Sequence, residues 1–164
     1  MGDAGTADAS SATYKGLAIA LTDASTKTMW CAQHVAICLG TLYDDRDAAK
    51  GDMAGIANTD ALIAHGTHTH AAASAARNYN SGTHPARTSA WFLPSTGQWD
   101  KMITAAGGFA ILRDNASLQA DSYWSSTEQH NSLNMNAFSY DFSYGKWDIT
   151  SKGSYFIVRS ALAF

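Results

Sequence analysis

The chain has 164 residues, of which 46% are hydrophobic, 11% aromatic and 15% charged, and its formal net charge is -3. This length predicts a single domain that buries its own core without metals or disulfide bonds. The aromatic content argues against intrinsic disorder, and a slightly negative charge without a basic cluster argues against nucleic-acid binding. No apolar run approaches the roughly 18 residues of a membrane span, so we expect no membrane insertion.

The first 15 residues are mostly Gly, Ala, Ser and Thr, and we interpret them as a flexible lead-in to a single domain over residues 16–164. They lack the basic stretch and apolar core of a signal peptide, so we expect none in this chain. The apolar run over residues 15–21 predicts a short buried strand. Residues 28–39 are also mostly apolar, and their composition leaves helix and strand open.

Cys31 and Cys38 are the two cysteines of the chain, and they lie seven residues apart. On a helix this spacing separates them by roughly 10 Å. A disulfide needs Cα atoms within about 7 Å, so we expect two small core residues rather than a disulfide bond.

A helix is predicted to begin near residue 61. Asn58, Thr59 and Asp60 are residue types that cap helix N-termini, and helix-forming residues follow them directly. The alanine-rich residues 71–77 predict a second helix with a small-residue face, and residues 78–85 have the composition of a loop.

Four of the six histidines lie at positions 65, 68, 70 and 84. The spacing of His65, His68 and His70 can hold zinc when the imidazoles are neutral. No Asp, Glu or Cys lies within the cluster to complete a site, so we interpret these histidines as structural or solvated. We therefore predict no metal and no other cofactor. A metal-dependent protein that uses this cluster stays open as an alternative.

The sharpest helix signal follows Pro94. Ser95 and Gln98 have the three-residue spacing of a capping box. Apolar residues then recur at helical spacing from Trp99 to position 106, and Gly107 ends the pattern. We expect this helix to pack Trp99 into the core.

The last third of the chain predicts strands and turns. Residues 137–144 alternate strictly between aromatic and small side chains, as in a half-buried strand. A turn is predicted at residues 144–146, and residues 146–149 return as the partner strand. Residues 155–164 are almost continuously apolar, which predicts one strand buried on both faces in the middle of a sheet.

Two segments resemble motifs of bacterial C-type-lectin-like domains. Residues 90–95 (AWFLPS) with Trp99 are similar to the tryptophan and Leu-Pro-Ser segment of that family, and residues 122–128 (SYWSSTE) are similar to its YWSSTE segment. The closing pattern of the family is matched by Ala137, Phe138, Phe142, Gly145, Lys152, Val158 and Arg159. Phe138 stands where tryptophan is usual, and Gln98 stands where glutamate is common.

These motifs cover residues 90–164, and the likeness over residues 16–89 is loose. The resemblance implies an α+β chain with a C-type-lectin-like fold. Such a fold has small mixed or antiparallel sheets, two or more flanking helices and long loops.

Within this fold, the chain most resembles the variable proteins of diversity-generating retroelements, which are ligand-binding proteins displayed on phage or cell surfaces. Their C-terminal coding segment is rewritten at template adenines, and the resemblance implies such a segment at about residues 122–164. An Asn codon altered at its adenines yields Asn, Ser, Asp, Tyr, His and Thr, and these types are frequent here. The mixture also resembles an antibody paratope.

We therefore predict a ligand-binding surface over a scaffold of buried Trp124, Phe142 and Val158. The tyrosines contribute most to binding energy in such surfaces. Trp147 is open between a binding anchor and a core residue. The predicted surface residues are His130, Asn131, Ser132, Asn134, Asn136, Ser139, Asp141, Ser143, Tyr144, Trp147, Asp148, Thr150, Ser154 and Tyr155.

The sequence favours binding over catalysis. Formylglycine-generating enzymes share the fold and use cysteines near the C-terminal region, whereas both cysteines here lie in the first quarter of the chain. A nucleophile elbow, Gly-x-Ser-x-Gly, is absent, and so is the Glu-Pro-Asn type of loop that binds calcium in sugar-binding lectins.

The expected function is therefore that of a non-enzymatic receptor or adhesin, either extracellular or displayed on a cell or virion surface. Its expected ligand is a protein or glycan on a target surface. A fixed-specificity surface adhesin or pilus-tip module of the same fold stays open as an alternative.

Overall fold

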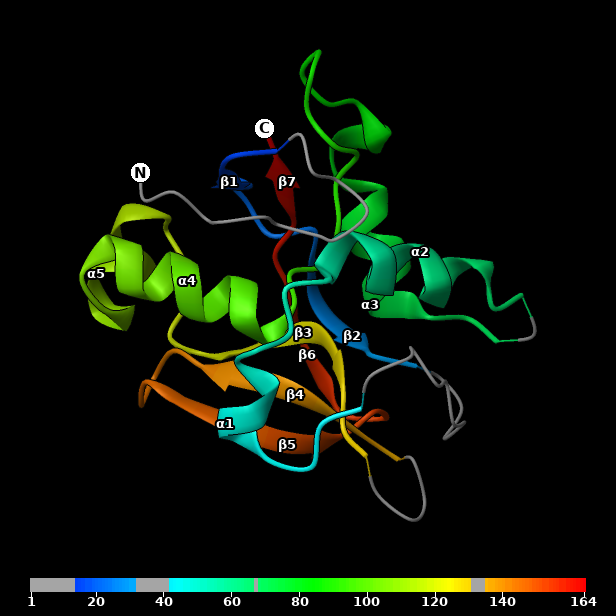
Figure 1. The fold of residues 1–164 in the computed structure, drawn as a ribbon, viewed down its shortest axis with the longest axis vertical. Coiled ribbons are helices and arrows are strands. Elements are labelled where there is room, and N and C mark those ends of the chain that lie inside the picture. The colour runs from blue at the N-terminus through cyan, green and yellow to red at the C-terminus, as the bar shows by residue number, and fades with distance from the viewer. Residues whose placement is uncertain (1–13, 32–41, 67, 131–134) are drawn as a thin grey trace.

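The computed structural model describes residues 14–31, 42–66, 68–130 and 135–164 (Figure 1). Its helices are α1 (Arg46–Ala49), α2 (Gly55–Ala64), α3 (Ala71–Arg77), α4 (Thr96–Ala106) and α5 (Phe109–Asn115), with a 3-10 turn, η1, at Tyr79–Gly82. Its strands are β1 (Leu17–Ile19), β2 (Ser25–Met29), β3 (Ser122–Glu128), β4 (Asn136–Asp141), β5 (Lys146–Ser151), β6 (Tyr155–Val158) and β7 (Ala161–Ala163). The expected α+β class is confirmed.

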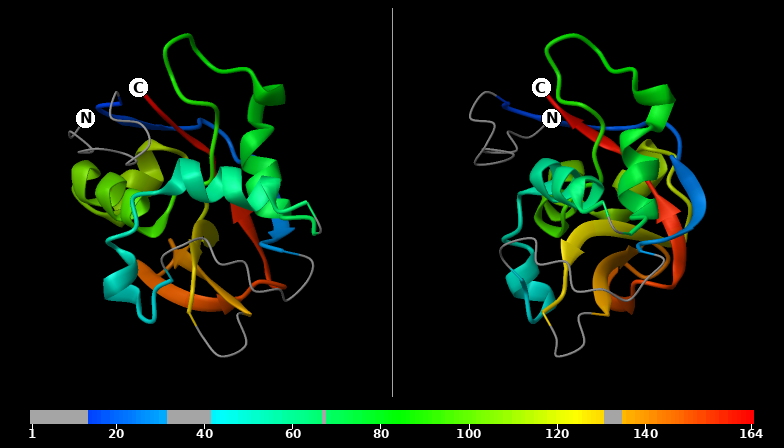
Figure 2. Two further views of the ribbon diagram at one scale, coloured as in Figure 1. Left: turned by 45° about the vertical axis from the view of Figure 1, so that its right-hand side comes forward. Right: turned by 90° about the vertical axis from the view of Figure 1, so that its right-hand side faces the viewer.

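The strands form two sheets. The larger has the order β2-β6-β3-β4-β5, and the smaller pairs β1 with β7 antiparallel. Most pairings in the larger sheet are antiparallel, and one parallel bridge, Tyr123 to Ile157, joins β3 to β6. Figure 2 shows α2, α4 and α5 between the β1–β7 pair on one side and the β4–β5 hairpin on the other, whereas α1 lies beside the hairpin. No helix in the described part of the chain combines the length and apolarity that crossing a membrane requires.

The prediction of one continuous strand over residues 155–164 is wrong. The run is divided into β6 and β7, which belong to different sheets. The break coincides with Arg159, whose side chain is 1% exposed. A buried guanidinium must satisfy its hydrogen-bond donors, and it draws its partners from several segments.

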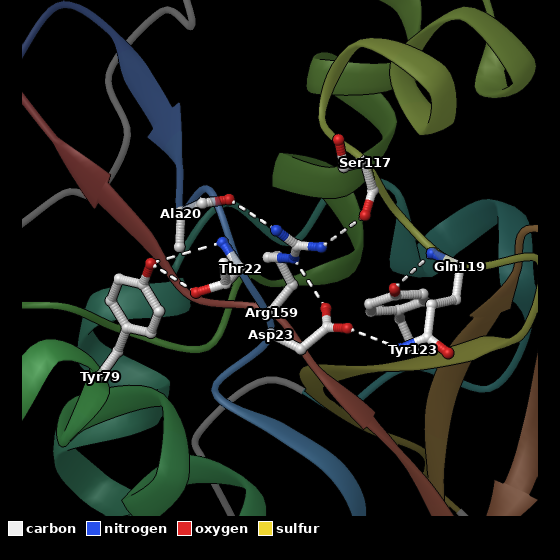
Figure 3. A network of polar contacts seen from close by, with 8 residues as sticks. All are labelled: Ala20, Thr22, Asp23, Tyr79, Ser117, Gln119, Tyr123 and Arg159. Carbon is white, nitrogen blue, oxygen red and sulfur yellow. Dashed lines mark hydrogen bonds and ion pairs between the residues drawn. The ribbon is translucent and has the colours of Figure 1, made fainter.

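Those partners surround the Arg159 guanidinium (Figure 3). It donates to the carbonyl oxygens of Ala20 at 2.9 Å and Ser117 at 3.1 Å, and its Nε lies 2.8 Å from the Asp23 carboxylate. The second oxygen of Asp23 accepts a hydrogen bond from the Gln119 amide at 2.9 Å. The network joins the segment between β1 and β2, the segment after α5 and the C-terminal strands.

The helix predicted after Pro94 is confirmed. The Ser95 N–H donates to the Gln98 side-chain oxygen at 3.0 Å, which is one half of a capping box, and Gly107 ends the helix in the left-handed conformation at φ 91°. Trp99 is fully buried, and its ring packs edge-on against Tyr123 and Phe142. Helix α4 thereby packs against the larger sheet.

The predicted start of the preceding helix is wrong. Helix α2 begins at Gly55, so Asn58 and Thr59 lie inside the helix and are buried rather than capping it. Thr59 Oγ1 donates to the Gly55 carbonyl at 2.7 Å, and the Asn58 amide donates to the Asp52 carboxylate at 2.9 Å. Each residue also has a tertiary partner: the Leu93 N–H donates to Thr59 Oγ1 at 3.0 Å, and the Asn58 amide donates to the Ser126 hydroxyl at 3.3 Å. These partners outweigh the capping preference of the two residues.

The remaining expectations for the first half are met in part. Strand β1 falls within residues 15–21, but its residues are half-buried. Within residues 28–39, the last residues of β2 are extended, and Cys31 is buried. Cys38 and the predicted lead-in up to residue 13 lie outside the described residues. The alanine-rich helix is confirmed as α3.

Candidate functional site

The β4–β5 hairpin carries most of the predicted surface residues. The two strands pair antiparallel from Asn136 opposite Ser151 to Asp141 opposite Lys146. Because side chains alternate along a strand, one face of the hairpin is apolar and the other is polar. The apolar face joins the core beneath α4 and α5 through Phe138, Tyr140, Trp147 and Ile149. The polar face presents Ser139, Asp141, Lys146, Asp148 and Thr150.

The expectation of a half-buried strand holds for only part of this segment. The central residues of β4 are buried on both faces, and the strand ends at Asp141, so Phe142 and Tyr144 belong to the following turn. Ser139 is 1% exposed, and its hydroxyl lies 3.1 Å from the Thr150 hydroxyl. Ser139 is therefore part of the interior rather than of an exposed surface.

Trp147, left open between anchor and core, lies in the core. It is 7% exposed and packs edge-on against Tyr140, with 4.9 Å between ring centroids. The geometry assigns this indole to the framework that supports the hairpin.

The turn between β4 and β5 projects Tyr144 into solvent, where 77% of the residue is exposed. Three contacts fix the turn beneath it. The Asp141 carboxylate accepts from the Ser143 N–H at 2.7 Å, and the Ser143 hydroxyl donates to the Ala120 carbonyl at 2.8 Å. Gly145 has φ 68° and lies so close to Phe109 that an added Cβ would approach that ring to 2.4 Å. The tyrosine therefore stands on a rigid support.

Charged side chains continue from Tyr144 along the polar face. The Lys146 ammonium lies 5.9 Å from the Tyr144 ring centroid and 3.2 Å from one oxygen of Asp148. Arg46 of α1 lies 3.6 Å from the other oxygen of Asp148. We call Arg46, Tyr144, Lys146 and Asp148 the hairpin-tip row. It combines an exposed ring with both signs of charge, so it can stack, donate and accept hydrogen bonds.

Sequence reasoning missed two members of this row. Arg46 belongs to the N-terminal half and is brought to Asp148 by the packing of α1 beside β5, for which the sequence carries no signal. Lys146 was recognised only as a strand residue. The charge alternation of Lys146 and Asp148 along one strand face is the signal that could have identified it.

The opposite end of the hairpin carries a second group of predicted residues. His130 Nδ1 lies 2.9 Å from the Asp44 carboxylate, and the Asn136 amide donates to the Gln129 side chain at 3.0 Å. Tyr155, 55% exposed, pairs with Met29 at the end of β2. The half-buried Ser154 directly precedes Tyr155, at the end of the connection from β5 to β6. The predicted residues Asn131, Ser132 and Asn134 lie outside the described residues.

The predicted surface is therefore divided between two ends. Asn136 and Asp141 are separated by five residue steps of β4, or about 17 Å at roughly 3.4 Å per residue. Figure 1 shows the turn after β4 at one end of the hairpin and the β5–β6 connection at the other. We call the second group the loop end, defined as His130, Asn136, Ser154 and Tyr155.

Lys152 is the anchor beneath the loop end. It is fully buried, its ammonium forms an ion pair with Glu128, and it lies 4.9 Å from the Trp30 ring centroid. Its carbonyl accepts from the Trp30 N–H at 2.9 Å and the Cys31 N–H at 3.3 Å, and its own N–H donates to the Met135 carbonyl at 2.8 Å. The ends of four strands, β2, β3, β4 and β5, thus converge on one residue.

The three clustered histidines meet Trp30 through His70, whose ring centroid lies 6.1 Å from that of the indole. His65 caps the C-terminus of α2, and its ring centroid is 5.7 Å from that of His68 and 5.5 Å from that of His70. Among the residues that the structure describes, no group of three His, Cys, Asp or Glu side chains is placed to hold a metal ion. Through Trp30, whose ring also contacts the Lys152 ammonium, the cluster lies next to the anchor of the loop end.

Comparison with protein-family models and with curated proteins finds no match to this chain.

Proposed function

We propose that this chain is a non-enzymatic ligand-binding protein of the receptor or adhesin type, with a C-type-lectin-like fold and a C-terminal surface diversified by a retroelement. One observation carries the proposal. Tyr144 and Tyr155 are exposed large aromatic residues, whereas Trp124, Phe142 and Val158 of the same C-terminal segment are fully buried. Exposed tyrosine on a rigid support is the arrangement by which binding surfaces gain affinity at low entropic cost.

The chemistry of the surface suits contact rather than catalysis. The hairpin-tip row offers a phenol ring, two cations and a carboxylate, and these groups pair with one another. The loop end offers an imidazole, an amide, a hydroxyl and a second phenol. Such groups hydrogen-bond and stack against a protein or a glycan without any bond being made or broken.

The framework also suits diversification. Exposed side chains can change at a cost that is usually within about 0.5 kcal/mol, provided that the residues beneath them stay fixed. Ser139 and Trp147 belong to that fixed set. The positions proposed to vary, among the described residues, are His130, Asn136, Asp141, Ser143, Tyr144, Asp148, Thr150, Ser154 and Tyr155.

The coarse architecture is compatible with the proposed fold. The chain has one small antiparallel sheet, one larger sheet with a single parallel bridge, and flanking helices. The residues of the proposed family motifs, Trp99, Trp124 and Arg159, are all buried at points where separate elements meet. On this proposal, the protein is displayed on a cell or virion surface and binds a protein or glycan of a target surface.

Deep sequencing of the DNA that encodes residues 122–164 in the source population tests the proposal. We expect variation at codons of the nine positions listed above, with Ser139, Trp147 and Arg159 constant. A uniform sequence over all of these codons would exclude diversification and indicate an adhesin of fixed specificity. Variation spread equally over buried and exposed codons would contradict the division between surface and framework.

A further inference from the structure

The imidazole of His70 is buried without hydrogen-bond partners. The residue is 1% exposed, and neither ring nitrogen has a partner among the described residues. Its ring packs edge-on against Trp30, with 6.1 Å between centroids and an interplanar angle of 77°. A buried polar group without a partner destabilises the folded state, because it has given up its hydrogen bonds to water. The binding surface proposed above makes no use of this side chain.

The groups that face His70 disfavour a positive charge on it. His65 and His68 approach from the connection between α2 and α3, and Lys152 approaches from the turn after β5. The Lys152 ammonium is itself paired with the carboxylate of Glu128 on β3. On α3 itself, Arg77 pairs with Asp60 of α2.

Trp30 connects His70 to the loop end. The Trp30 indole contacts the His70 ring, and the Lys152 ammonium lies over the same indole. Trp30 further donates from its indole Nε1 to the Ser125 carbonyl at 2.8 Å. A charged imidazolium at position 70 needs water or an anionic partner, so it must leave the edge of Trp30.

We propose that the cluster of His65, His68 and His70 is an acid-sensitive switch, in which protonation of His70 opens the contact between α3 and Trp30 and frees the end of β2 from Lys152. The opening acts on β2, whose last residue, Met29, pairs with Tyr155. Where the proposed binding function holds, acid would therefore loosen the loop end and leave the hairpin-tip row in place. The switch itself does not depend on that function.

The direction and size of the effect follow from proton linkage. Burial, reinforced by His65, Lys152 and His68, lowers the pKa of His70 from 6.5 to about 4. An opened state that restores the ordinary pKa of 6.5 binds the proton more tightly, so opening becomes easier as the pH falls from 6.5 towards 4. At pH 5, the population of the opened state rises about thirty-fold relative to pH 8.

Amide hydrogen exchange at Trp30 and Cys31 tests the switch, because both N–H groups donate to the Lys152 carbonyl. Protection factors are compared at pH 8 and pH 5, since intrinsic exchange rates also change with pH. We expect protection to fall about thirty-fold in the natural chain and to change little in H70F, which keeps a ring against Trp30 and carries no proton. H84Q is the matched control, since His84 is exposed and contacts Thr88, and it should behave as the natural chain does.

A second measurement tests the switch even if H70F does not fold. In the natural chain with labelled histidine, NMR titration should give His70 a midpoint at least 1.5 pH units below that of the unfolded chain, as the drop of about 2.5 units implies. A midpoint near 6.5, or equal loss of protection in H70F, would overturn the proposal. Tightly bound stoichiometric zinc that shifts the His70 resonances would also overturn it. None of these readouts uses a ligand, so failure of the switch and failure of the binding function stay distinguishable.

Discussion

Arg159 and Asp23 form an ion pair, with 2.8 Å between Nε and the carboxylate, that joins the C-terminal strands to the segment between β1 and β2. Both side chains are withdrawn from solvent, and the pair lies within the network of Figure 3. The two strands next to this network, β1 and β7, form the smaller sheet. The pair therefore joins a segment near the beginning of the described chain, at Asp23, to one near its end, at Arg159.

Replacing Arg159 should destabilise the protein strongly. R159M removes the cation and leaves the Asp23 carboxylate and the Ala20 carbonyl without their partner in a buried setting. Breaking one side of a buried ion pair costs about 3–5 kcal/mol. We expect the free energy of unfolding in urea to fall by this amount.

K146M is the matched control for that measurement. Lys146 also forms an ion pair, with Asp148, but on the surface. Exposed pairs contribute about 0–1 kcal/mol, so this variant should lose little stability. Equal losses in R159M and K146M would show that burial of the Arg159 pair has no special effect.

Alanine at Gly145 should destabilise the hairpin turn for two reasons. The backbone at φ 68° disfavours any side chain, and the new Cβ would lie 2.4 Å from the Phe109 ring. We expect G145A to lower the free energy of unfolding by about 1–3 kcal/mol from the strained backbone, with an added cost from the clash. Thermal unfolding followed by circular dichroism measures the loss.

G107A separates the two contributions. Gly107 is also left-handed, at φ 91°, but its added Cβ meets the nearest atom at an ordinary 3.4 Å. This variant should show the backbone cost alone and lose less stability than G145A. The double variant G145A/F109A should recover the part due to the clash, and no recovery would show that Phe109 does not confine the turn.

Tyr144 and Tyr140 belong to one hairpin, but their replacement by alanine should affect the free energy of unfolding very differently. Tyr144 is exposed, so Y144A should change the free energy of unfolding by no more than about 0.5 kcal/mol. Tyr140 is buried against Phe142 and Trp147, so Y140A should cost about 3–5 kcal/mol. Urea unfolding of both variants gives the comparison.

The two exposed tyrosines, Tyr144 and Tyr155, test the binding proposal once a target is found by display of the chain against candidate cell surfaces. Y144A or Y155A should weaken cell binding at least ten-fold while folding stays intact, because exposed tyrosines concentrate binding energy. If either variant unfolds, that tyrosine belongs to the structural framework and not to the binding surface. Unchanged binding in both would place the binding surface elsewhere.

Stability should also fall at alkaline pH through Tyr140. Burial, together with Asp100 and Asp141, raises the pKa of this phenol to about 12 from 10.0. Between these two pH values the folded chain keeps a proton that the unfolded chain has lost, so the free energy of unfolding falls as the pH rises. The loss from Tyr140 reaches at most about 2.7 kcal/mol.

Y140F isolates that contribution. The phenyl ring keeps the packing and removes the titrating group. Burial also raises the pKa of Tyr43 and Tyr123, so part of the alkaline loss should persist in the variant. Urea unfolding at pH 9 and at pH 11.5 should therefore show a smaller decrease in Y140F than in the natural chain. Identical decreases would mean that Tyr140 ionises as freely in the folded state as in the unfolded state.

Local signals in the sequence were sufficient where the deciding contacts are local. The capping pair Ser95 and Gln98, with Gly107 at the other end, defines α4 through residues within one helix. The turn at Gly145 and the return of the chain as β5 are equally local, and both were predicted. The exposed positions of Tyr144 and Tyr155 also agree with the sequence-based expectation.

Predictions failed where distant partners decide. Arg159 breaks the last apolar run because its partners lie near Ala20 and Ser117, far away in the sequence. Asn58 lies inside α2 and does not cap it for the same reason, because its amide donates to the distant Ser126 hydroxyl at 3.3 Å. The alternation of β4 correctly predicts two faces, but it carries no information on what covers Ser139. The division of the binding surface into two ends depends on strand length and register, which composition does not encode.

The length of the β4–β5 hairpin limits what a single ligand can touch. The two ends of β4, Asn136 and Asp141, lie about 17 Å apart, with Tyr144 beyond one end of the hairpin and Tyr155 beyond the other. A single sugar ring is too small to contact both, whereas a folded protein or a branched glycan can span them. On the proposed binding function, one chain would therefore be geometrically bivalent, and its two ends could acquire separate specificities whose affinities multiply only for targets of matching size.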